Sequence, residues 1–381
     1  MTLKAFMNEI NVGGLTQLVL WVAFALSVVF GAIARRTHFC AMGAIADIVS
    51  MNDWKRARMW ALAVATAVLG FNAMVAMGWI EAGNSIYAGP RLLWLSVLVG
   101  GLMFGFGMVL ASGCGARNLV RLGGGNLKSL VVLLVMATTA SATLRGLTAV
   151  WRVDTVERVF VELPGGQDVP SLLSHVMGAA TGMTTPMLAA LVGGLVTLAL
   201  LVWVLRRPEG RSRETWLGGF GIGAVIVGVW WVSGCLGYLP EDPNTLEPAF
   251  LATNSHHMEA LSMAAPLAYA FEWVQFYSDA SRTLTLGIVA MFGVVLGAFI
   301  VALAERSFRW EGFAGVEDLA SHLMGATLMG VGGVVTMGCT VGQGLSGVST
   351  LSIGSVIAVL GIGSGAWFGL RWRIWRLERS A

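Results

Sequence analysis

Nine long apolar stretches follow one another along the chain, and short polar segments, many of them basic, separate most of them. Each stretch has about 20 residues, the length that an α-helix needs to cross the hydrocarbon core of a bilayer. They lie at about residues 15–34, 57–80, 91–112, 128–150, 186–206, 215–233, 284–305, 317–338 and 351–371. The pattern predicts an all-α polytopic membrane protein with about nine transmembrane helices.

The composition supports a membrane protein. Of the 381 residues, 56% are hydrophobic and only 12% are charged, whereas soluble domains have about 45–50% apolar and about 25% charged residues. A bilayer can cover this apolar surface, so membrane lipid is an expected partner. The net charge of +3 is small and no long basic tract is present, so no nucleic-acid partner is expected.

The positive charges predict an orientation, because lysine and arginine in short loops favour the cytoplasm. With nine spans and a cytoplasmic C-terminus, most of the 24 lysine and arginine residues fall on one face. The basic clusters are Arg35–Arg36, Lys55–Arg58, Arg117–Lys128, Arg206–Arg213, Arg306–Arg309 and Arg371–Arg379. We therefore expect a multi-pass protein of the bacterial inner membrane with a periplasmic N-terminus, and residues 1–14 do not resemble a cleavable signal peptide.

Two long loops interrupt this regular pattern. Residues 151–185 and 235–283 contain proline and acidic residues and are expected outside the cell. Within the second loop, residues 259–277 are apolar but are broken by Pro266 and flanked by acids. This segment is predicted to be an interfacial helix and not a span. Arg145 is expected inside the fourth span.

The cysteines reveal an internal repeat. The first and sixth spans end at Cys40 and Cys235, and each cysteine is followed seven residues later by an aspartate. The third and eighth spans end at Cys114 and Cys339, and each is followed by a glycine-rich stretch and another span. The matching spans run in opposite directions through the bilayer. Inverted repeats of this kind are typical of secondary transporters.

The repeat divides the chain into a 4+1+4 arrangement. Residues 1–150 form the first inverted repeat, and residues 151–214 contain a periplasmic loop and the connecting fifth span. Residues 215–381 form the second repeat, with the insertion at 235–283. The segments after the cysteines, about 38–50, 115–126 and 340–350, are too short to span and are predicted to be half-helices or re-entrant loops. Ordinary glycine-rich surface loops are the alternative.

All four cysteines lie at the C-terminal end of a span, beside small residues. A single buried cysteine is usually an inert small hydrophobe, but four at repeat-related positions favour a shared role. There is no C-x-x-C motif, and His38 is the histidine near this set, so neither a metal site nor a cofactor is expected. The pair His256–His257 lies in an outer loop and is expected to be solvated.

Three strings resemble the YeeE/YedE sulfur-transport family: HFCAMGAIAD, GFGMVLASGCGARNLVRLGGGNLKSL and GVGGVVTMGCTVGQGLSGVSTLSIGSV. The resemblance covers most of residues 15–150 and 284–371. It implies nine helices plus short half-helices in an hourglass, whose waist passes thiosulfate inward past three cysteines. The matching positions here are Cys40, Cys114 and Cys339, and Cys235 would belong to the outer vestibule if it lined the path. A cytoplasmic TusA-like sulfur-carrier protein is the implied partner.

The chemistry of the surrounding residues fits an anion path. Backbone N–H groups at half-helix N-termini offset part of the dehydration cost of a dianion, and neutral thiols are weak donors that bind without trapping. Arg117 and Arg121 follow Cys114 on one helix face and are expected to form a cytoplasmic exit funnel or an anchor at the membrane surface. Uncharged hydrogen bonds to the anion are expected from the following residues: Asn118, Thr340, Gln343 and Ser346.

Other functions remain open from the sequence. A passive channel for another small anion, or a carrier of another sulfur or selenium species, would share the same architecture. A membrane thiol oxidoreductase would need cysteines close enough to form disulfides, and the chain shows no accompanying quinone or haem site. We therefore expect no catalytic residues and a transport function.

Overall fold

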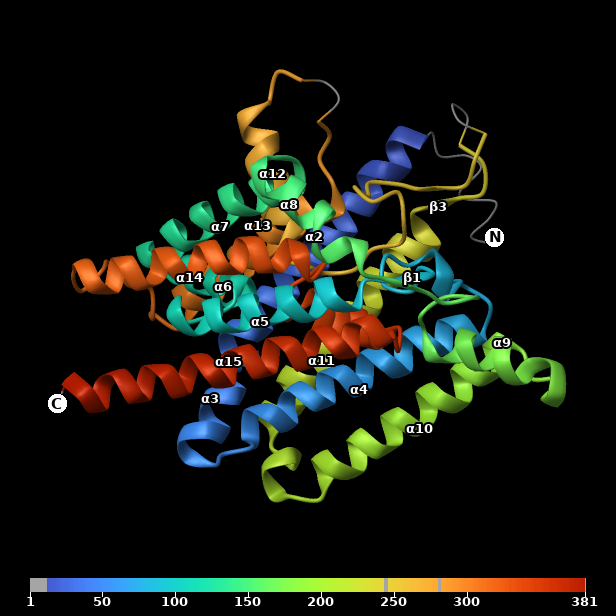
Figure 1. The fold of residues 1–381 in the computed structure, drawn as a ribbon, viewed down its shortest axis with the longest axis horizontal. Coiled ribbons are helices and arrows are strands. Elements are labelled where there is room, and N and C mark those ends of the chain that lie inside the picture. Colours follow the sequence, from blue (N-terminus) through green and yellow to red (C-terminus); the bar gives the residue numbers. More distant parts are fainter. Residues whose placement is uncertain (1–11, 243–245, 280–281, 381) are drawn as a thin grey trace.

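The computed structural model describes residues 12–242, 246–279 and 282–380. In these residues, nine helices or helical segments are long and apolar enough to cross a membrane, in agreement with the predicted number (Figure 1). The long helices are α2 (Val12–Arg36), α4 (Lys55–Ala76), α5 (Trp94–Leu110), α7 (Leu127–Arg145), α10 (Thr185–Leu205), α11 (Arg213–Trp231), α13 (Leu286–Ala304), α14 (Val316–Val335) and α15 (Ile353–Ser380).

Short helical segments follow four of the long helices. The α-helices α3 (Ala41–Met51) and α6 (Gly115–Gly123) follow α2 and α5, and the π-helical turns η4 (Val232–Leu236) and η5 (Gly342–Gly347) follow α11 and α14. Three of these lie where the sequence predicts half-helices. The turn η4, which contains Cys235, was not expected.

The remaining elements belong to the connecting loops. The helices are α8 (Leu147–Asp154), α9 (Val169–Thr181), α12 (Ala265–Gln275), η1 (Ala82–Asn84), η2 (Val156–Arg158) and η3 (Pro208–Arg211). The strand β1 (Arg91–Leu92) pairs antiparallel with β2 (Val161–Glu162), and β3 (Tyr238–Leu239) pairs with β4 (Ala249–Phe250). Both small sheets lie at the end of the bundle opposite α3 and the C-terminal end of α15 (Figure 1).

Two sequence predictions near the outer loops need correction. The fourth span ends at Arg145 and not near residue 150, because the chain breaks at Gly146 before α8 begins. Arg145 is therefore the last residue of its helix, and it pairs with Glu272 of α12. A helix forms only over Ala265–Gln275 of the predicted 259–277. Residues 259–264 are irregular, and four of the six are buried in the protein interior.

The long helices pack mainly in pairs from opposite halves of the chain. The helix α2 packs on α13, α4 on α11, α5 on both α14 and α15, and α7 on α14. Glycines allow the backbones to approach closely at these crossings. A Cβ atom on Gly297 would lie 1.9 Å from the Val28 carbonyl oxygen, and one on Gly105 would lie 2.1 Å from that of Ile362.

Ion pairs join segments that the charge pattern assigned to the same face. The pairs at the face predicted to be cytoplasmic are Arg36–Glu305, Arg56–Asp47, Lys55–Glu214, Arg58–Glu209, Lys128–Asp318 and Arg376–Glu317. Those at the other face are Arg91–Glu162, Arg152–Glu157, Arg158–Asp154, Arg145–Glu272, Arg282–Glu272 and Arg282–Asp279. In the described part of the chain no ion pair joins the two faces, which supports the predicted alternation of loops.

Candidate functional site

The same backbone turn precedes three of the four cysteines. The residue two positions before each of them adopts a left-handed conformation, which is uncommon for any residue except glycine. These residues are His38 (φ 50°), Ser112 (φ 56°) and Met337 (φ 59°). They precede Cys40, Cys114 and Cys339 respectively, so three distant parts of the chain share one local geometry.

This turn ends each long helix and redirects the chain. The residue after the left-handed position donates its N–H to a carbonyl five residues back, as in a Schellman motif. The N–H of Gly113 bonds to Met108 O at 2.8 Å, and that of Gly338 bonds to Gly333 O at 2.9 Å. The corresponding bond from Phe39 is 3.1 Å long. The turn leaves each cysteine at the start of the next helical segment.

Two of the three sulfur atoms accept backbone hydrogen bonds there. The N–H of Gly43 lies 3.3 Å from Cys40 Sγ, which caps the N-terminus of α3. The N–H of Gly342 lies 3.4 Å from Cys339 Sγ, which also accepts the N–H of Met263 at 3.3 Å. Both interactions leave the thiol hydrogen available to another acceptor, because sulfur is the acceptor in each.

The three thiols come together in the interior. Cys40, Cys114 and Cys339 are 8%, 3% and 0% exposed. Cys114 lies beside the Thr340 side chain and near both other cysteines. The backbone of Met263 lies between the segment that begins at Cys339 and the start of α6, because its N–H bonds to Cys339 Sγ and its carbonyl is close to Gly115. The structure therefore gathers side chains that lie 74 to 299 positions apart in the sequence into one buried cluster.

Two buried amides support the turns. Asn118 and Gln343 each follow a cysteine by four residues. Asn118 Nδ2 donates to the carbonyls of Gly113 and Cys114 at 3.0 and 3.1 Å. Gln343 Nε2 donates to Thr336 O at 2.6 Å, and its Oε1 accepts the Ser355 hydroxyl at 2.7 Å. In this conformation both side chains are bound to the protein, and they hold the carbonyl groups of the turns in place.

The other predicted site residues lie around the cluster. Thr340 is buried beside Cys114, and the buried Ser346 hydroxyl donates to Leu261 O at 2.7 Å. Arg121 Nη1 donates to Ser112 O at 3.1 Å, so it stabilises the turn before Cys114. Arg117 is on α6, and its aliphatic part packs against Gly113 of the preceding turn. All four residues lie in the segments that follow Cys114 and Cys339.

Cys235 differs from the other cysteines. It lies in the π-helical turn η4, is only half-buried, and donates its thiol to Trp79 O at 3.7 Å. No left-handed residue precedes it. The repeat pairs Cys235 with Cys40, because an aspartate follows each of them at the same spacing. The local structures of the two cysteines nevertheless differ. All four cysteines are free thiols.

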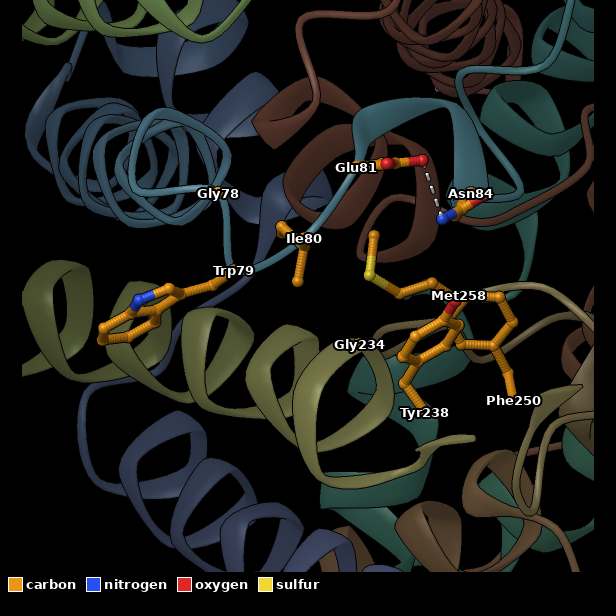
Figure 2. Close-up of a pocket in the computed structure, with 9 residues that line it drawn as sticks. All are labelled: Gly78, Trp79, Ile80, Glu81, Asn84, Gly234, Tyr238, Phe250 and Met258. Atoms are coloured by element: carbon orange, nitrogen blue, oxygen red, sulfur yellow. Dashed lines mark hydrogen bonds between the residues drawn. The ribbon is translucent and has the colours of Figure 1, made fainter. Parts of the chain in front are cut away.

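The neighbour of Cys235, Gly234, lines a cavity of about 160 Å³ whose wall contains none of the three central thiols. The lining comes from residues 78–84, η4, the two short strands and Met258. Figure 2 shows the side chains of Ile80 and Met258 between Trp79 on one side and Tyr238 and Phe250 on the other. Because β3 and β4 lie at the predicted outer end, we call this space the outer cavity.

A second cavity, of about 240 Å³, lies next to the thiol cluster. Its lining is almost entirely apolar and includes Ala41, Trp60, Thr340 and Gly344. It confirms that the start of α3 lies against the segment that follows Cys339.

The sequence did not predict that residues 258–264 contact Cys339. Residues 258–264 belong to the outer insertion, yet Met263 contacts the sulfur of Cys339 and Ser262 lies against Gly342. The segment has no charge except Glu259 and no periodic pattern, so nothing in the sequence distinguishes it from the adjoining helix. Tyr87, another neighbour of Gly342, was missed for the same reason.

Comparisons with known proteins agree with this architecture. Residues 36–368 match a family described as Sulphur transport. The chain is 24% identical over 345 residues to the thiosulfate transporter TsuA of Escherichia coli (strain K12), which covers 88% of this chain and 91% of that protein. It is 24% identical over 362 residues to the thiosulfate transporter TsuA of Spirochaeta thermophila, which covers 94% of this chain and 100% of that one. A probable transporter, YedE of Escherichia coli (strain K12), is 29% identical over 102 residues, 26% of this chain and 23% of that protein.

Proposed function

This chain belongs to the sulphur transport family, and we propose that it imports thiosulfate, or a related small sulfur anion, through a constriction lined by Cys40, Cys114 and Cys339. The observation that carries the proposal is the convergence of these three buried thiols, each placed by the same turn. The family and the names of the relatives indicate transport and not catalysis.

The constriction can bind a dianion without an ionised side chain in its wall. The α-helices α3 and α6 begin directly after Cys40 and Cys114, and a helix N-terminus carries about half of a positive elementary charge. The thiols add weak S–H donors and polarizable sulfur atoms. Weak successive sites favour conduction, because an ion that binds too tightly does not leave.

Uncharged and cationic groups then define the inner side of the route. The Thr340 hydroxyl, beside Cys114, is the uncharged group best placed to donate to an anion, because the amides of Asn118 and Gln343 are engaged by the protein. Arg117 and Arg121 draw the anion towards the cytoplasm by long-range attraction. Arg121 does so while it holds the Ser112 carbonyl.

We also propose the 4+1+4 inverted repeat, with residues 1–150 and 215–381 as the two halves. Helix packing supports it, since the α2–α13 pair corresponds to α11–α4 and the α5–α15 pair corresponds to α14–α7. The matching turns before Cys114 and Cys339 support it as well. The distribution of basic segments favours an inner-membrane location with the C-terminus in the cytoplasm. There the arginine-rich end of α15 is available to a TusA-like sulfur carrier.

Growth on thiosulfate as the sole sulfur source tests the function. In a strain that lacks other uptake systems, the wild-type chain should restore growth, whereas Cys114→Ala and Cys339→Ala should not, at equal protein levels in the membrane. Cys235→Ala is the matched control, because this thiol lies outside the central cluster, and it should restore growth. Growth with both central variants would exclude the cysteine route and favour a channel that selects by size and charge.

A further inference from the structure

A non-helical segment of the outer insertion lies between the outer cavity and the central thiols. We call residues 258–264 the cover segment. Five of its seven residues are buried, and Leu261, Met263 and Ala264 have no exposed surface. Its first residue, Met258, lines the outer cavity, and its sixth, Met263, bonds to Cys339. The segment therefore runs from the outer cavity to the constriction.

Polar anchors hold the cover segment along its length. They come from the loop after α4, from η4, from η5 and from the cysteine itself. The bonds are Met258 N–H to Asn84 O (2.9 Å), Glu259 N–H to Ser233 Oγ (2.9 Å), Ser346 Oγ to Leu261 O (2.7 Å) and Met263 N–H to Cys339 Sγ (3.3 Å). At Met258 a second backbone bond, from the Ile86 N–H to Met258 O at 3.3 Å, reinforces the first. Each of the other three anchors is a single bond between different parts of the chain, so it can be exchanged without unfolding a helix.

The cover segment also closes the floor of the outer cavity. The sulfur of Met258 lies so close to Gly234 that a Cβ on this glycine would be 2.3 Å from it. Ile80 is packed against the same glycine. The wall of the outer cavity also includes Glu81 and Asn84, so an anion there meets polar as well as apolar groups. Beyond the apolar floor of Ile80 and Met258 lies Cys339, whose sulfur accepts two N–H groups of the protein.

We infer that the cover segment is the outer gate of the transport route, and that it opens by withdrawing Met263 from the sulfur of Cys339. This inference rests on the proposed function for its direction of flow. In the closed conformation described here, the backbone of the gate takes the place next to Cys339 that the anion would occupy. Withdrawal leaves Cys339 with its bond from Gly342 and opens the space beside the thiol. The thiol proton, which neither backbone bond uses, can then bond to the incoming anion.

Both ends of the segment are held by the protein. On one side α12 begins at Ala265, and Glu272 of this helix is bound by Arg145, Arg282 and the Ser141 hydroxyl. On the other side Met258 exchanges backbone bonds with Asn84 and Ile86, although His256 and His257 before it are exposed. The proposed movement is therefore a local displacement of residues 259–263 between these two fixed points.

Chemical modification of Cys339 from outside tests the gate without relying on transport. The background variant is Cys40→Ala, Cys114→Ala and Cys235→Ala, in which Cys339 is the sole thiol. Right-side-out vesicles are treated with 2-sulfonatoethyl methanethiosulfonate, an anion that does not cross membranes, and the modification rate is measured by mass spectrometry. Ser233→Ala, which removes the anchor of the Glu259 N–H, should raise the rate about tenfold, because a lost hydrogen bond shifts the closed state by about this factor.

Two further variants control this experiment. Ser346→Ala removes the hydrogen bond to Leu261 O and should also raise the modification rate of Cys339. Agreement between the two variants shows that the result does not depend on one misfolded protein. Ser27→Ala is the matched control, because this hydroxyl is equally buried but bonds only to Ala23 O of its own helix, and its rate should equal the background. Each protein is checked for a single size-exclusion peak.

The outcomes separate the gate from the proposed function. Rapid modification in the background, or equal rates in all the variants, would overturn the gate. If Ser233→Ala and Ser346→Ala accelerate modification while wild-type protein takes up no thiosulfate, the gate stands and the proposed substrate is wrong. If wild-type protein takes up thiosulfate but modification is not accelerated, the anion enters by another route.

Discussion

Replacing Cys339 by alanine and by serine separates two properties of its sulfur atom. The sulfur accepts the backbone N–H groups of Met263 and Gly342 at 3.3 and 3.4 Å in a site with no exposed surface. It is also one of the three polarizable atoms of the proposed constriction. Alanine removes both properties, whereas serine keeps a hydrogen-bond acceptor and removes the polarizable atom.

The effect on stability follows from the two bonds. In Cys339→Ala, two buried N–H groups lose their acceptor, and a buried unsatisfied group costs about 1–3 kcal/mol. Sulfur is a weak acceptor, so the lower end of this range applies to each bond and the total loss is about 2 kcal/mol. Cys339→Ser should lower the free energy of unfolding by less than half as much as Cys339→Ala does, because the serine hydroxyl oxygen still accepts hydrogen bonds. Some loss remains, since the shorter Cβ–O bond places the oxygen farther from both N–H donors.

Transport should follow a different order. We expect both variants to take up thiosulfate at least about tenfold more slowly than the wild-type protein, the factor that corresponds to about 1.4 kcal/mol. Uptake of radiolabelled thiosulfate by proteoliposomes and thermal unfolding of the same purified protein measure the two effects separately. Wild-type uptake by Cys339→Ser, together with a clear loss in Cys339→Ala, would refute the requirement for sulfur and leave Cys339 with a purely structural role.

Three further outcomes test the packing and the charges. Gly297→Ala should lower the melting temperature strongly, because its Cβ would lie 1.9 Å from the Val28 carbonyl oxygen, whereas Gly194→Ala in α10, with no atom within 4 Å, should be neutral or stabilising. Glu272→Gln should weaken the free energy of unfolding by about 1–2 kcal/mol in chemical denaturation, since this buried carboxylate holds two arginines that are themselves partly exposed; an unchanged denaturation curve would refute this role. Burial raises the pKa of Glu259, so the stability that its protonated form contributes is present below about pH 4.5 and is lost as the pH rises through the raised pKa. The melting temperature of Glu259→Gln should therefore depend less on pH between pH 4 and 7 than that of the wild-type protein. Equal slopes of melting temperature against pH in the two proteins would contradict this.

The spanning helices could be predicted from sequence because bilayer thickness imposes a length on any apolar helix. The end of the fourth span was harder, since residues after Gly146 stay apolar although the helix breaks there. Composition reports whether a residue tolerates lipid. It does not report where the backbone bends.

The thiol cluster could be anticipated only in part. Repeat positions and the family resemblance identified Cys40, Cys114 and Cys339, and the structure brings all three together. The left-handed turns gave no signal, because the residue at that position of the third turn is Met337, whereas glycine or asparagine usually marks such a turn. Cys235 shared the spacing to an aspartate with Cys40, but spacing did not determine its local structure.

The contact between Met263 and Cys339 could not be predicted at all. The two residues are 76 positions apart, and the bond joins a backbone amide to a side chain. A backbone donor leaves no trace in residue identity, since every residue except proline can supply it. Such contacts become visible only when the three-dimensional path of the chain is known.

The repeated turn also has a consequence for how this scaffold can diverge. Main-chain bonds such as Gly113 N–H to Met108 O and Gly338 N–H to Gly333 O form the turn, and no cysteine side chain takes part in them. The main-chain turn is thus formed independently of the three side chains, although the sulfurs of Cys40 and Cys339 also accept N–H groups of the segments that follow. Point mutations at those three positions would therefore keep the turn and change the side chains of the proposed constriction, with a loss of stability where a sulfur accepts a backbone bond.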